Sequence, residues 1–407
     1  MRWNILMVAF EAGRWGPSRL VQQLAAGGFD VSVLCRGDNA LNQSSHISKH
    51  HALRGVKSSR SFRARLRAVL SERMPDLVVP CDERAVAALH AVVKQQRAGA
   101  RIISDEAYKM LVRSLAEPDR LDAVLMKDQT LALARELGIA TPQTVAISNA
   151  DQAATEADEL GFPVFVKSAF SWAGLGTIWC NSTQEVSEAF NALIAGSNSS
   201  PFKTLMRKLL AREWYPSKPV IELQKAAAGK PAMYCAVALD GKLLAGFSGI
   251  TQKNIGRSGP STVVWIGYNK AFEDAARSLI AATRTSGFVG FDFMWDEVHQ
   301  SAVLLECNPR PIQICHLGET IGVNLCSALA NALEGKASAR AALPQEAVVR
   351  LFPQDCSRDE GSELAQAAAL DVPRQDPKLL QFMLQEGKRH GCSFDKLKLA
   401  LAMQRRN

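Results

Sequence analysis

The chain has 407 residues, 47% of them hydrophobic, and a formal net charge of +8. Its length is too great for one hydrophobic core, so we expect two or three structural units. The composition excludes a disordered chain, and no stretch is apolar for long enough to span a membrane as a helix. The nine cysteines form no C-x-x-C pair, which predicts reduced thiols and a cytoplasmic protein. Basic residues are not interleaved with aromatic ones, so we expect neither a nucleic-acid nor a membrane partner.

The N-terminal part, residues 1–115, alternates short apolar runs with segments of helical spacing. The runs Ile5–Phe10, Val31–Cys35 and Leu77–Pro80 are typical of strands that are buried on both faces of a parallel sheet. The helical segments between them give a βαβ order, which predicts an open parallel sheet covered by helices. We therefore expect a Rossmann-like N-terminal domain of the α/β class.

A short polar segment, Cys81-Asp82-Glu83-Arg84, follows the third apolar run. It lies at the carboxyl end of a predicted parallel strand, which is where open sheets bind ligands. An acidic residue at this place would also cap the helix that follows. Ligand binding and helix capping both remain open as interpretations of this segment.

The rest of the chain divides into two α+β units and an extension. The first unit contains a helix that begins near Lys127 and a strand that ends at Lys167. The second unit contains a series of strands, among them a hairpin. The predicted bounds are 116–195 and 196–335 for the two units and 336–407 for the C-terminal extension.

The predicted hairpin consists of two alternating apolar runs, Phe291–Met294 and Leu304–Asn308. Asp292 interrupts the first run. On the second run, Glu306 and Asn308 lie two residues apart, so their side chains leave the same face of the strand. The pattern therefore brings two carboxylates and a carboxamide within reach of one point.

Such oxygen ligands suit Mg²⁺ that carries a polyphosphate, and the cationic Arg310 follows directly after them. An ordinary hairpin with an exposed acidic edge is the alternative. We favour the metal site, because unpaired charge is costly inside apolar strands.

These residues resemble the magnesium-binding end of ATP-grasp ligases, where an acidic residue on one strand is followed by Glu-x-Asn-x-Arg on the next. Two lysines upstream extend the resemblance. Lys127 resembles the first phosphate-binding lysine of the family, and Gly138-Ile139-Ala140-Thr141-Pro142 resembles the usual entry to its first lobe. Lys167, at the end of a strand, resembles the second lysine, which binds the α- and β-phosphates.

Two further segments resemble parts of an ATP-grasp nucleotide site. The loop after the second lysine resembles the small-residue loop that closes over the phosphates, and it would contribute Ser171, Gly174 and Gly176. A later strand resembles the one that meets adenine. Its contact would be made by either Glu222 or Gln224, and the alternative is an inter-lobe strand with one exposed acid.

Two residues are candidates for substrate contact. Arg257 lies in a loop that resembles one facing the acceptor site of carboxylate–amine ligases, and it would bind a carboxylate. A solvated turn arginine fits this position equally well. His316 would also contact substrate, although a lone histidine is more often structural.

The resemblance implies a Rossmann-like domain followed by a two-lobed ATP-grasp fold, and an ATP-dependent ligase. Such an enzyme would activate a carboxylate as an acyl phosphate, join it to an amine, and release ADP and phosphate. Lys127 would hold ATP, and Arg310 and Lys167 would act in catalysis. Two Mg²⁺ ions, which Mn²⁺ can replace, are the implied metals, and their ligands would be Asp292, Glu306 and Asn308.

Two other functions remain as alternatives. One is a bicarbonate-activating carboxylase or an enzyme of the carbamoyl-phosphate type. The other is a non-catalytic ATP-binding regulator, which the presence of both lysines and all three metal ligands disfavours. The expected partners are small-molecule carboxylate and amine substrates, and a homo-oligomer is compatible with the sequence.

Overall fold

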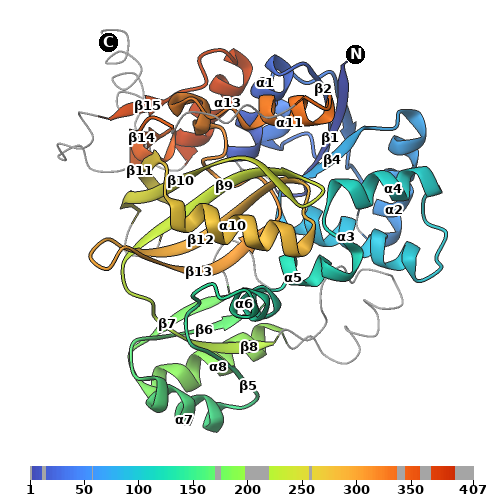
Figure 1. Cartoon of the computed structure of the whole chain (residues 1–407). Coiled ribbons are helices and arrows are strands. Elements are labelled where there is room, and N and C mark those ends of the chain that lie inside the picture. The colour runs from blue at the N-terminus through green and yellow to red at the C-terminus, as the bar shows by residue number, and fades with distance from the viewer. Residues whose placement is uncertain are drawn as a thin grey trace.

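The structure, a computed structural model, describes residues 2–11, 15–56, 58–169, 176–197, 220–255, 259–336, 344–357 and 368–389. Three β-sheets organise these residues (Figure 1). A four-stranded sheet formed by the N-terminal residues lies beside a seven-stranded sheet in the middle of the molecule. A second four-stranded sheet lies at the other end.

The N-terminal sheet is parallel, as predicted. Its strands are β1 (Trp3–Val8), β2 (Phe29–Cys35), β3 (Lys49–Ala52) and β4 (Leu77–Pro80), in the order β3-β2-β1-β4, and its helices are α1 (Trp15–Ala26), α2 (Ser59–Glu72), α3 (Glu83–Arg97) and α4 (Asp105–Ser114). In β1, Ile5 and Met7 enter one hydrophobic core, whereas Leu6 and Val8 enter another. Burial on both faces explains the unbroken apolar run. The polar strand β3 has no such run and was not predicted.

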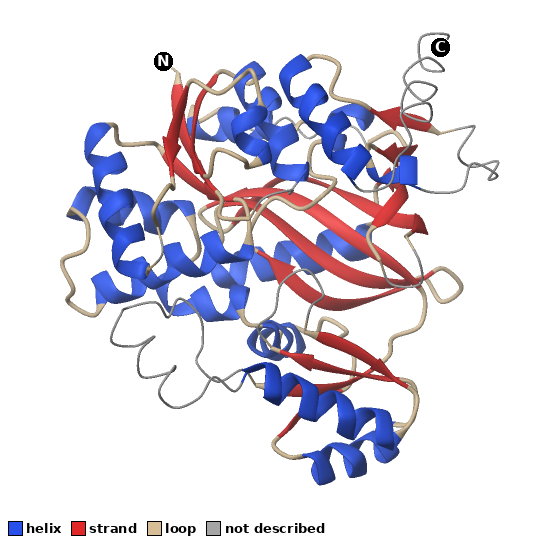
Figure 2. Ribbon diagram, turned by 180° about the vertical axis from the view of Figure 1, so that it is seen from behind, coloured by secondary structure: helices blue, strands red, loops and turns tan. Residues whose placement is uncertain are grey.

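The smaller sheet at the far end is antiparallel. Its strands are β5 (Thr144–Ile147), β6 (Val164–Ser168), β7 (Thr177–Cys180) and β8 (Ile221–Lys225), in the order β5-β8-β6-β7. Helices α7 (Ala150–Leu160) and α8 (Thr183–Ser197) cover one face (Figure 2).

The predicted bounds put β8 in the second unit because it lies beyond residue 196, but β8 hydrogen-bonds to β5 and β6. Ile221 and Leu223 pack in the same core as Val164 and Val166, and this shared core explains why the strand joins the smaller sheet.

The seven-stranded sheet carries the predicted hairpin at one edge. Its strands are β9 (Lys230–Leu239), β10 (Lys242–Asn254), β11 (Ser261–Gly267), β12 (Gly287–Asp296), β13 (Ser301–Asn308), β14 (Ala347–Leu351) and β15 (Ala369–Asp371), in the order β13-β12-β9-β10-β11-β14-β15. Helix α10 (Lys270–Thr283) covers one face, and α11 (Leu325–Leu333) covers the other. The predicted extension thus supplies two strands to this sheet.

One hydrophobic core joins the N-terminal sheet to the seven-stranded sheet. Ile5 of β1 and Leu20 of α1 belong to the same cluster of buried side chains as Val237 of β9, Phe247 of β10 and Leu329 of α11. The two sheets are therefore held together by apolar packing through α1 and α11.

The turn between β9 and β10 has the predicted Asp-Gly form. Asp240 and Gly241 have φ angles of 50° and 78°, which are the positive values that a tight hairpin turn requires. Gly229, the residue before β9, has a φ of 110°, and a Cβ there would lie 2.3 Å from the backbone oxygen of Trp295. Glycine at that position thus allows the chain to approach the end of β12 closely.

The remaining elements connect the three sheets. They are α5 (Leu121–Leu125), α6 (Lys127–Glu136) and α13 (Pro377–Arg389), with 3-10 turns η1 (Ala40–Gln43), η2 (Pro118–Arg120), η3 (Leu317–Ile321) and η4 (Gln354–Ser357). Helix α6 lies between the smaller sheet and the hairpin (Figure 1). Within the described ranges, no helix has the length and apolar character needed to cross a membrane.

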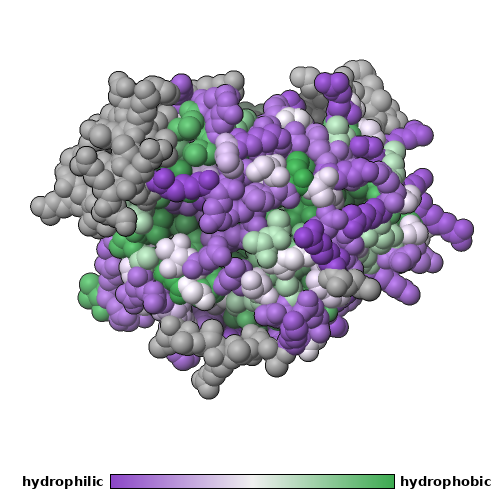
Figure 3. Space-filling model, turned by 90° about the horizontal axis from the view of Figure 1, so that it is seen from above, coloured by the Kyte–Doolittle hydropathy of each residue, from purple (hydrophilic) through white to green (hydrophobic). Residues whose placement is uncertain are grey.

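The surface of the described residues is mainly polar. Hydrophilic residues cover most of the face seen in Figure 3. The large exposed hydrophobic residues in the described ranges are Leu137, Val220, Ile255 and Val298. Seven cysteines whose side chains the structure describes are free thiols.

Candidate functional site

The hairpin β12–β13 places two carboxylates directly opposite each other. Asp292 pairs with Glu306 across the two strands, and Phe293 pairs with Leu304, so Leu305 has no partner in the register. This β-bulge changes the face on which the following residues lie. Leu304 points into the hydrophobic core, and Glu306, two residues later, is on the other face beside Asp292.

Asn308 and Arg310 continue this cluster. The Asn308 side-chain amide donates to Asp292 Oδ2 at 3.0 Å, and its oxygen accepts from Arg310 Nη2 at 3.0 Å. Arg310 Nη1 also donates to the Pro311 carbonyl oxygen at 3.2 Å. The Arg310 Nε atom is buried and has no hydrogen-bond partner among the described residues. The structure therefore brings together the four residues that the Asp…Glu-x-Asn-x-Arg pattern singled out.

Lys127 reaches the cluster from the first residue of α6. Its ammonium lies 2.6 Å from Glu306 Oε2. Its backbone N–H donates to the carbonyl oxygen of Ala169, just after β6, at 3.1 Å, which attaches the start of α6 to the smaller sheet. Burial raises the pKa of Glu306, but the Lys127 charge, the hydrogen bonds with Asp292 and Lys127 and the Lys167 charge together hold that pKa below its usual range.

Lys167 lies on the face of the smaller sheet that is turned toward α6. Its ammonium donates to Gln224 Oε1 at 2.9 Å, and Gln224 in turn donates to Thr144 Oγ1 at 2.9 Å. Burial and the nearby Lys127 charge lower the pKa of Lys167 to about 8. Glu222 is opposite Lys167 in the strand register and is buried, which raises the pKa of Glu222. Its Oε2 atom lacks a hydrogen-bond partner in the described part of the chain.

A divalent cation fits this donor set. Burial and the adjacent Glu306 charge raise the pKa of Asp292 well above its usual value, because two carboxylates this close repel each other. A cation between them would remove that repulsion, and carboxylate and carboxamide oxygens are the ligands that Mg²⁺ prefers. The residues present therefore suit Mg²⁺ held by Asp292 and Glu306, with Asn308 beside them.

The other predicted site residues are placed as follows. Gly176 immediately precedes β7, and its carbonyl oxygen accepts from the Ser168 N–H at 2.9 Å. His316 lies away from the hairpin cluster, where its Nε2 contacts Asp371 Oδ2 at 2.7 Å. Three predicted positions fall outside the described residues, namely Ser171, Gly174 and Arg257.

The segment after β4 provides both a cap and a contact to the cluster. Asp82 caps α3 through the Ala85 N–H at 2.8 Å, which confirms the capping interpretation. Glu83 lies 2.5 Å from Arg310 Nη2. Sequence reasoning did not connect Glu83 with Arg310, because 227 positions separate them and only the packing of two sheets brings them together.

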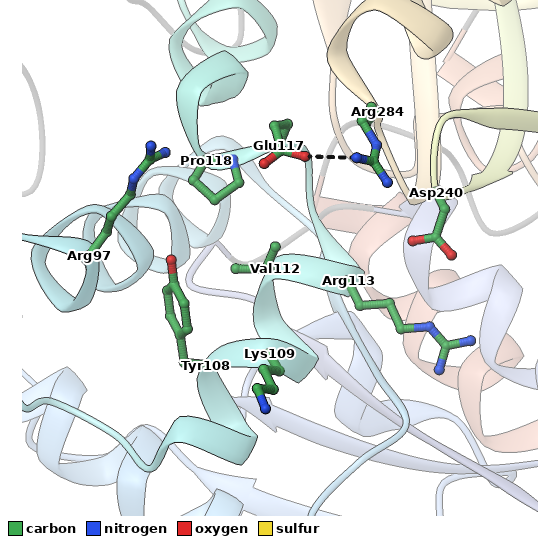
Figure 4. A pocket seen from close by; sticks show the side chains of 9 residues that line it. All are labelled: Arg97, Tyr108, Lys109, Val112, Arg113, Glu117, Pro118, Asp240 and Arg284. Carbon is green, nitrogen blue, oxygen red and sulfur yellow. Dashed lines mark ion pairs between the residues drawn. The ribbon is translucent and has the colours of Figure 1, made fainter.

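A separate pocket of about 390 Å³ lies at the junction of α4, η2, α10 and the β9–β10 turn (Figure 4). An ion pair of 3.5 Å between Arg284 and Glu117 crosses it. None of the residues that line it belongs to the hairpin cluster; they are Arg97, Tyr108, Lys109, Val112, Arg113, Glu117, Pro118, Asp240 and Arg284.

Comparison with known families identifies this arrangement. Residues 127–328 match the family described as the ATP-binding domain of the carbamoyl-phosphate synthase L chain. The chain belongs to the ATP-grasp superfamily. The matched range begins at Lys127 and includes Lys167 and the whole hairpin, so the ATP-grasp domain contains the cluster described above.

Two solved ATP-grasp structures show the same fold over most of the chain. An L-amino acid ligase from Bacillus licheniformis has a TM-score of 0.58 at 13% identity, with 85% of this chain and 79% of that one covered. The biotin carboxylase domain of a 2-oxoglutarate carboxylase from Hydrogenobacter thermophilus, in complex with MgADP and bicarbonate, has a TM-score of 0.61 at 14% identity, with coverage of 86% and 74%. These ATP-grasp relatives thus include both amine ligases and carboxylases.

Curated relatives match shorter parts. The arginine-specific carbamoyl phosphate synthase large chain of Bacillus subtilis is 24% identical over 190 residues, which cover 47% of this chain and 17% of that protein. The chain spans between 9% and 34% of the length of three curated relatives that it matches.

Proposed function

We propose that this ATP-grasp protein is an ADP-forming ligase that activates a carboxylate as an acyl phosphate and joins it to an amine. The observation that carries the proposal is the convergence of Lys127, Glu306 and Asp292 at the hairpin, with Lys167 on the facing sheet. These residues come from four separate elements, α6, β6, β12 and β13, and a cluster of two carboxylates and two largely buried ammonium groups suits a metal–polyphosphate.

Each residue has a role in the proposed reaction. Lys127 and Lys167 bind the phosphates of ATP and neutralise their charge. Mg²⁺, held by Asp292, Glu306 and Asn308, supplies further neutralisation of the polyphosphate when it is bound.

Arg310 stabilises negative charge on the phosphoryl group as it passes to the carboxylate. The amine then attacks the acyl carbon and phosphate leaves. The protein acts chiefly by orienting the reactants and excluding water from the acyl phosphate.

The architecture supports the remaining parts of the proposal. We assign a Rossmann-like domain to the N-terminal parallel sheet, one ATP-grasp lobe to the smaller sheet and the other to the seven-stranded sheet. Glu222 and Gln224 of β8 lie beside Lys167 of β6 in the smaller sheet, which supports a nucleotide contact by either of them. Ser171 and Gly174 in the closing loop, Arg257 and His316 in substrate contact, and a cytoplasmic location stay predictions.

A bicarbonate-activating carboxylase is the second candidate. The fold similarity to a biotin carboxylase domain solved with MgADP and bicarbonate supports it. Both candidates share the ATP half of the reaction, and they differ in whether the acyl phosphate is formed from an organic acid or from bicarbonate.

ADP release tests the proposal. The protein with Mg²⁺ and ATP is assayed against a panel of amino acids, dipeptides and other carboxylates, with and without amine acceptors. A ligase gives ADP only when an acid and an amine are both present, and Glu306→Gln abolishes the signal. ADP release that requires bicarbonate and no organic acid would favour the carboxylase. ATP binding with no turnover under any condition would contradict both and favour a regulator.

A further inference from the structure

An ion pair links the N-terminal sheet to the catalytic hairpin. Glu83, the first residue of α3, lies 2.5 Å from Arg310 Nη2, and the two side chains are 16% and 10% exposed. Buried ion pairs hold their partners in a fixed geometry, because separating them leaves a charge without solvation. The contact therefore constrains the guanidinium of Arg310.

The segment that carries Glu83 is itself firmly held. The neighbouring Asp82 is fully buried and accepts hydrogen bonds from the N–H groups of Phe10 at 2.6 Å and Glu11 at 2.9 Å. These bonds join the loop after β4 to the loop after β1. Glu83 thus extends toward Arg310 from a rigid base at the carboxyl edge of the parallel sheet.

The contacts of Arg310 leave part of its guanidinium unused. One amino group contacts Glu83 and the Asn308 oxygen, and the other donates to the Pro311 carbonyl. An arginine has more N–H donors than these contacts consume. The buried Nε atom has no partner among the described residues. The two amino groups of the guanidinium are therefore fixed by Glu83, Asn308 and Pro311, while its Nε–H remains available as a donor.

We propose that Glu83 is a positioning residue for Arg310. It holds the guanidinium so that the unused donors are available to the phosphoryl group during transfer. The inference rests on the proposed function of Arg310, and it makes the N-terminal sheet a necessary part of the reaction centre. A planar guanidinium recognises an oxyanion only in a narrow range of orientations, so a second anchor besides Asn308 has a direct effect on rate.

Steady-state kinetics with an acid and an amine that give ADP release in the panel assay separates positioning from binding. Glu83→Gln keeps the size of the side chain but removes its charge. We expect kcat to fall by about 10-fold to 100-fold, while the KM for MgATP stays within about twofold. Glu83→Asp keeps the charge and restores part of kcat. The matched control is Asp30→Asn, which breaks an ion pair with Arg73 in the same N-terminal unit, at 2.6 Å, without touching the hairpin.

A binding measurement tests the inference without any knowledge of the substrates. Calorimetry compares MgADP alone with MgADP plus aluminium fluoride, which mimics the transferred phosphoryl group. In Glu83→Gln we expect affinity for MgADP to be unchanged and affinity for the fluoride complex to fall about tenfold. Asp30→Asn should behave like the wild type in both.

The outcomes separate the two proposals. Suppose that Glu83→Gln selectively loses affinity for the fluoride complex, while the wild type shows no turnover with any acid and amine. That combination would reject the ligase proposal and retain the role of Glu83. Equal weakening of MgADP and of the fluoride complex would show a general structural role and overturn the inference. Two other results would overturn the inference. One is that aluminium fluoride does not raise the affinity of the wild type for MgADP, and the other is that Glu83→Gln and Asp30→Asn have the same affinity for the fluoride complex.

Discussion

Lys167 is a lysine whose charge is lost near pH 8 in the nucleotide-free protein. Burial and the charge of Lys127 lower its pKa to about 8, from an ordinary value of 10.5. Only the charged form attracts phosphate, so binding of ATP favours uptake of a proton by this side chain. The pH dependence of nucleotide binding therefore includes a contribution from Lys167, which a substitution at this position isolates.

We expect ATP affinity to weaken as the pH rises above about 8, because the free protein then loses the proton that binding requires. One pH unit above the pKa, the neutral form predominates roughly tenfold, so affinity at pH 9 should be about tenfold below that at pH 7. Calorimetry in two buffers of different ionisation enthalpy would show proton uptake on binding.

The control for this experiment is Lys270→Gln, which removes an exposed ammonium at the start of α10. It should bind nucleotide with the wild-type pH profile. Lys167→Met should lose most of the affinity together with its pH dependence. An unchanged profile in Lys167→Met would assign the titration to another group.

The acidic cluster on the hairpin β12–β13 lowers the stability of the folded protein. An acid whose pKa is raised on folding destabilises the native state at every pH above its unfolded pKa. Asp292 is such an acid, because burial and Glu306 both disfavour its charge. Function and stability thus make opposite demands on one element.

Asp292→Asn should stabilise the metal-free protein at pH 8 by about 1 kcal/mol, because it removes the repulsion from Glu306 at nearly constant size. The same variant should lose Mg²⁺-dependent nucleotide binding. Urea unfolding without Mg²⁺ measures the first effect, and calorimetry measures the second.

Asp296→Asn, at the end of the same strand, is the matched comparison. Asp296 accepts hydrogen bonds from Val298 and His299 in the turn, so its replacement should lower stability and leave metal binding intact. A lower stability of Asp292→Asn would contradict this expectation. It would show that attraction to Lys127 and Arg310 outweighs the repulsion between Asp292 and Glu306.

Local patterns in the sequence predicted some of these elements and not others. The apolar run of β4 and the alternation in the hairpin identified strands, and the resemblance to ATP-grasp ligases identified Lys127 and Arg310 as residues of one site. The placement of β8 in the smaller sheet depends on which core Ile221 enters, and local periodicity does not encode that choice. The partner of Arg310 lies on another sheet, so no spacing rule could find it.

The C-terminal residues are part of the folded molecule. Asp371 at the end of β15 forms an ion pair of 2.7 Å with Arg19 of α1 and contacts His316. Asp376 accepts from the N–H and the hydroxyl of Ser45, at 3.0 and 2.8 Å. The last described strand and helix are thereby fastened to the N-terminal unit, in agreement with their proximity in Figure 1.

Asp371→Asn should lower the free energy of unfolding by about 3 kcal/mol at pH 7, because it leaves the buried Arg19 without a counter-charge. His316 contributes little charge at that pH, since burial lowers its pKa. The pKa of Asp371 is held well below its usual range, so the stabilisation is fully present above the unfolded carboxyl pKa, begins to fall near pH 4, and is lost only as the pH drops through the much lower folded pKa.

Guanidinium unfolding of the variant and the wild type at pH 7 and pH 3 measures this difference. Asp38→Asn, which affects an exposed pair with Arg36, is the control and should change stability little. A difference between wild type and Asp371→Asn that persists undiminished at pH 3 would contradict the electrostatic origin.

The β-bulge at Leu305 has a consequence for how this protein can evolve. Because one unpaired residue decides which face Glu306 occupies, loss of that residue would turn Glu306 toward the core that Leu304 now fills. Substitutions along the hairpin change one side chain at a time. A single-codon insertion or deletion between Phe293 and Glu306 instead turns the core-facing side chains of the strand to the site face, and the site residues to the core. Descendants of this chain can therefore vary the composition of the hairpin far more freely than its length.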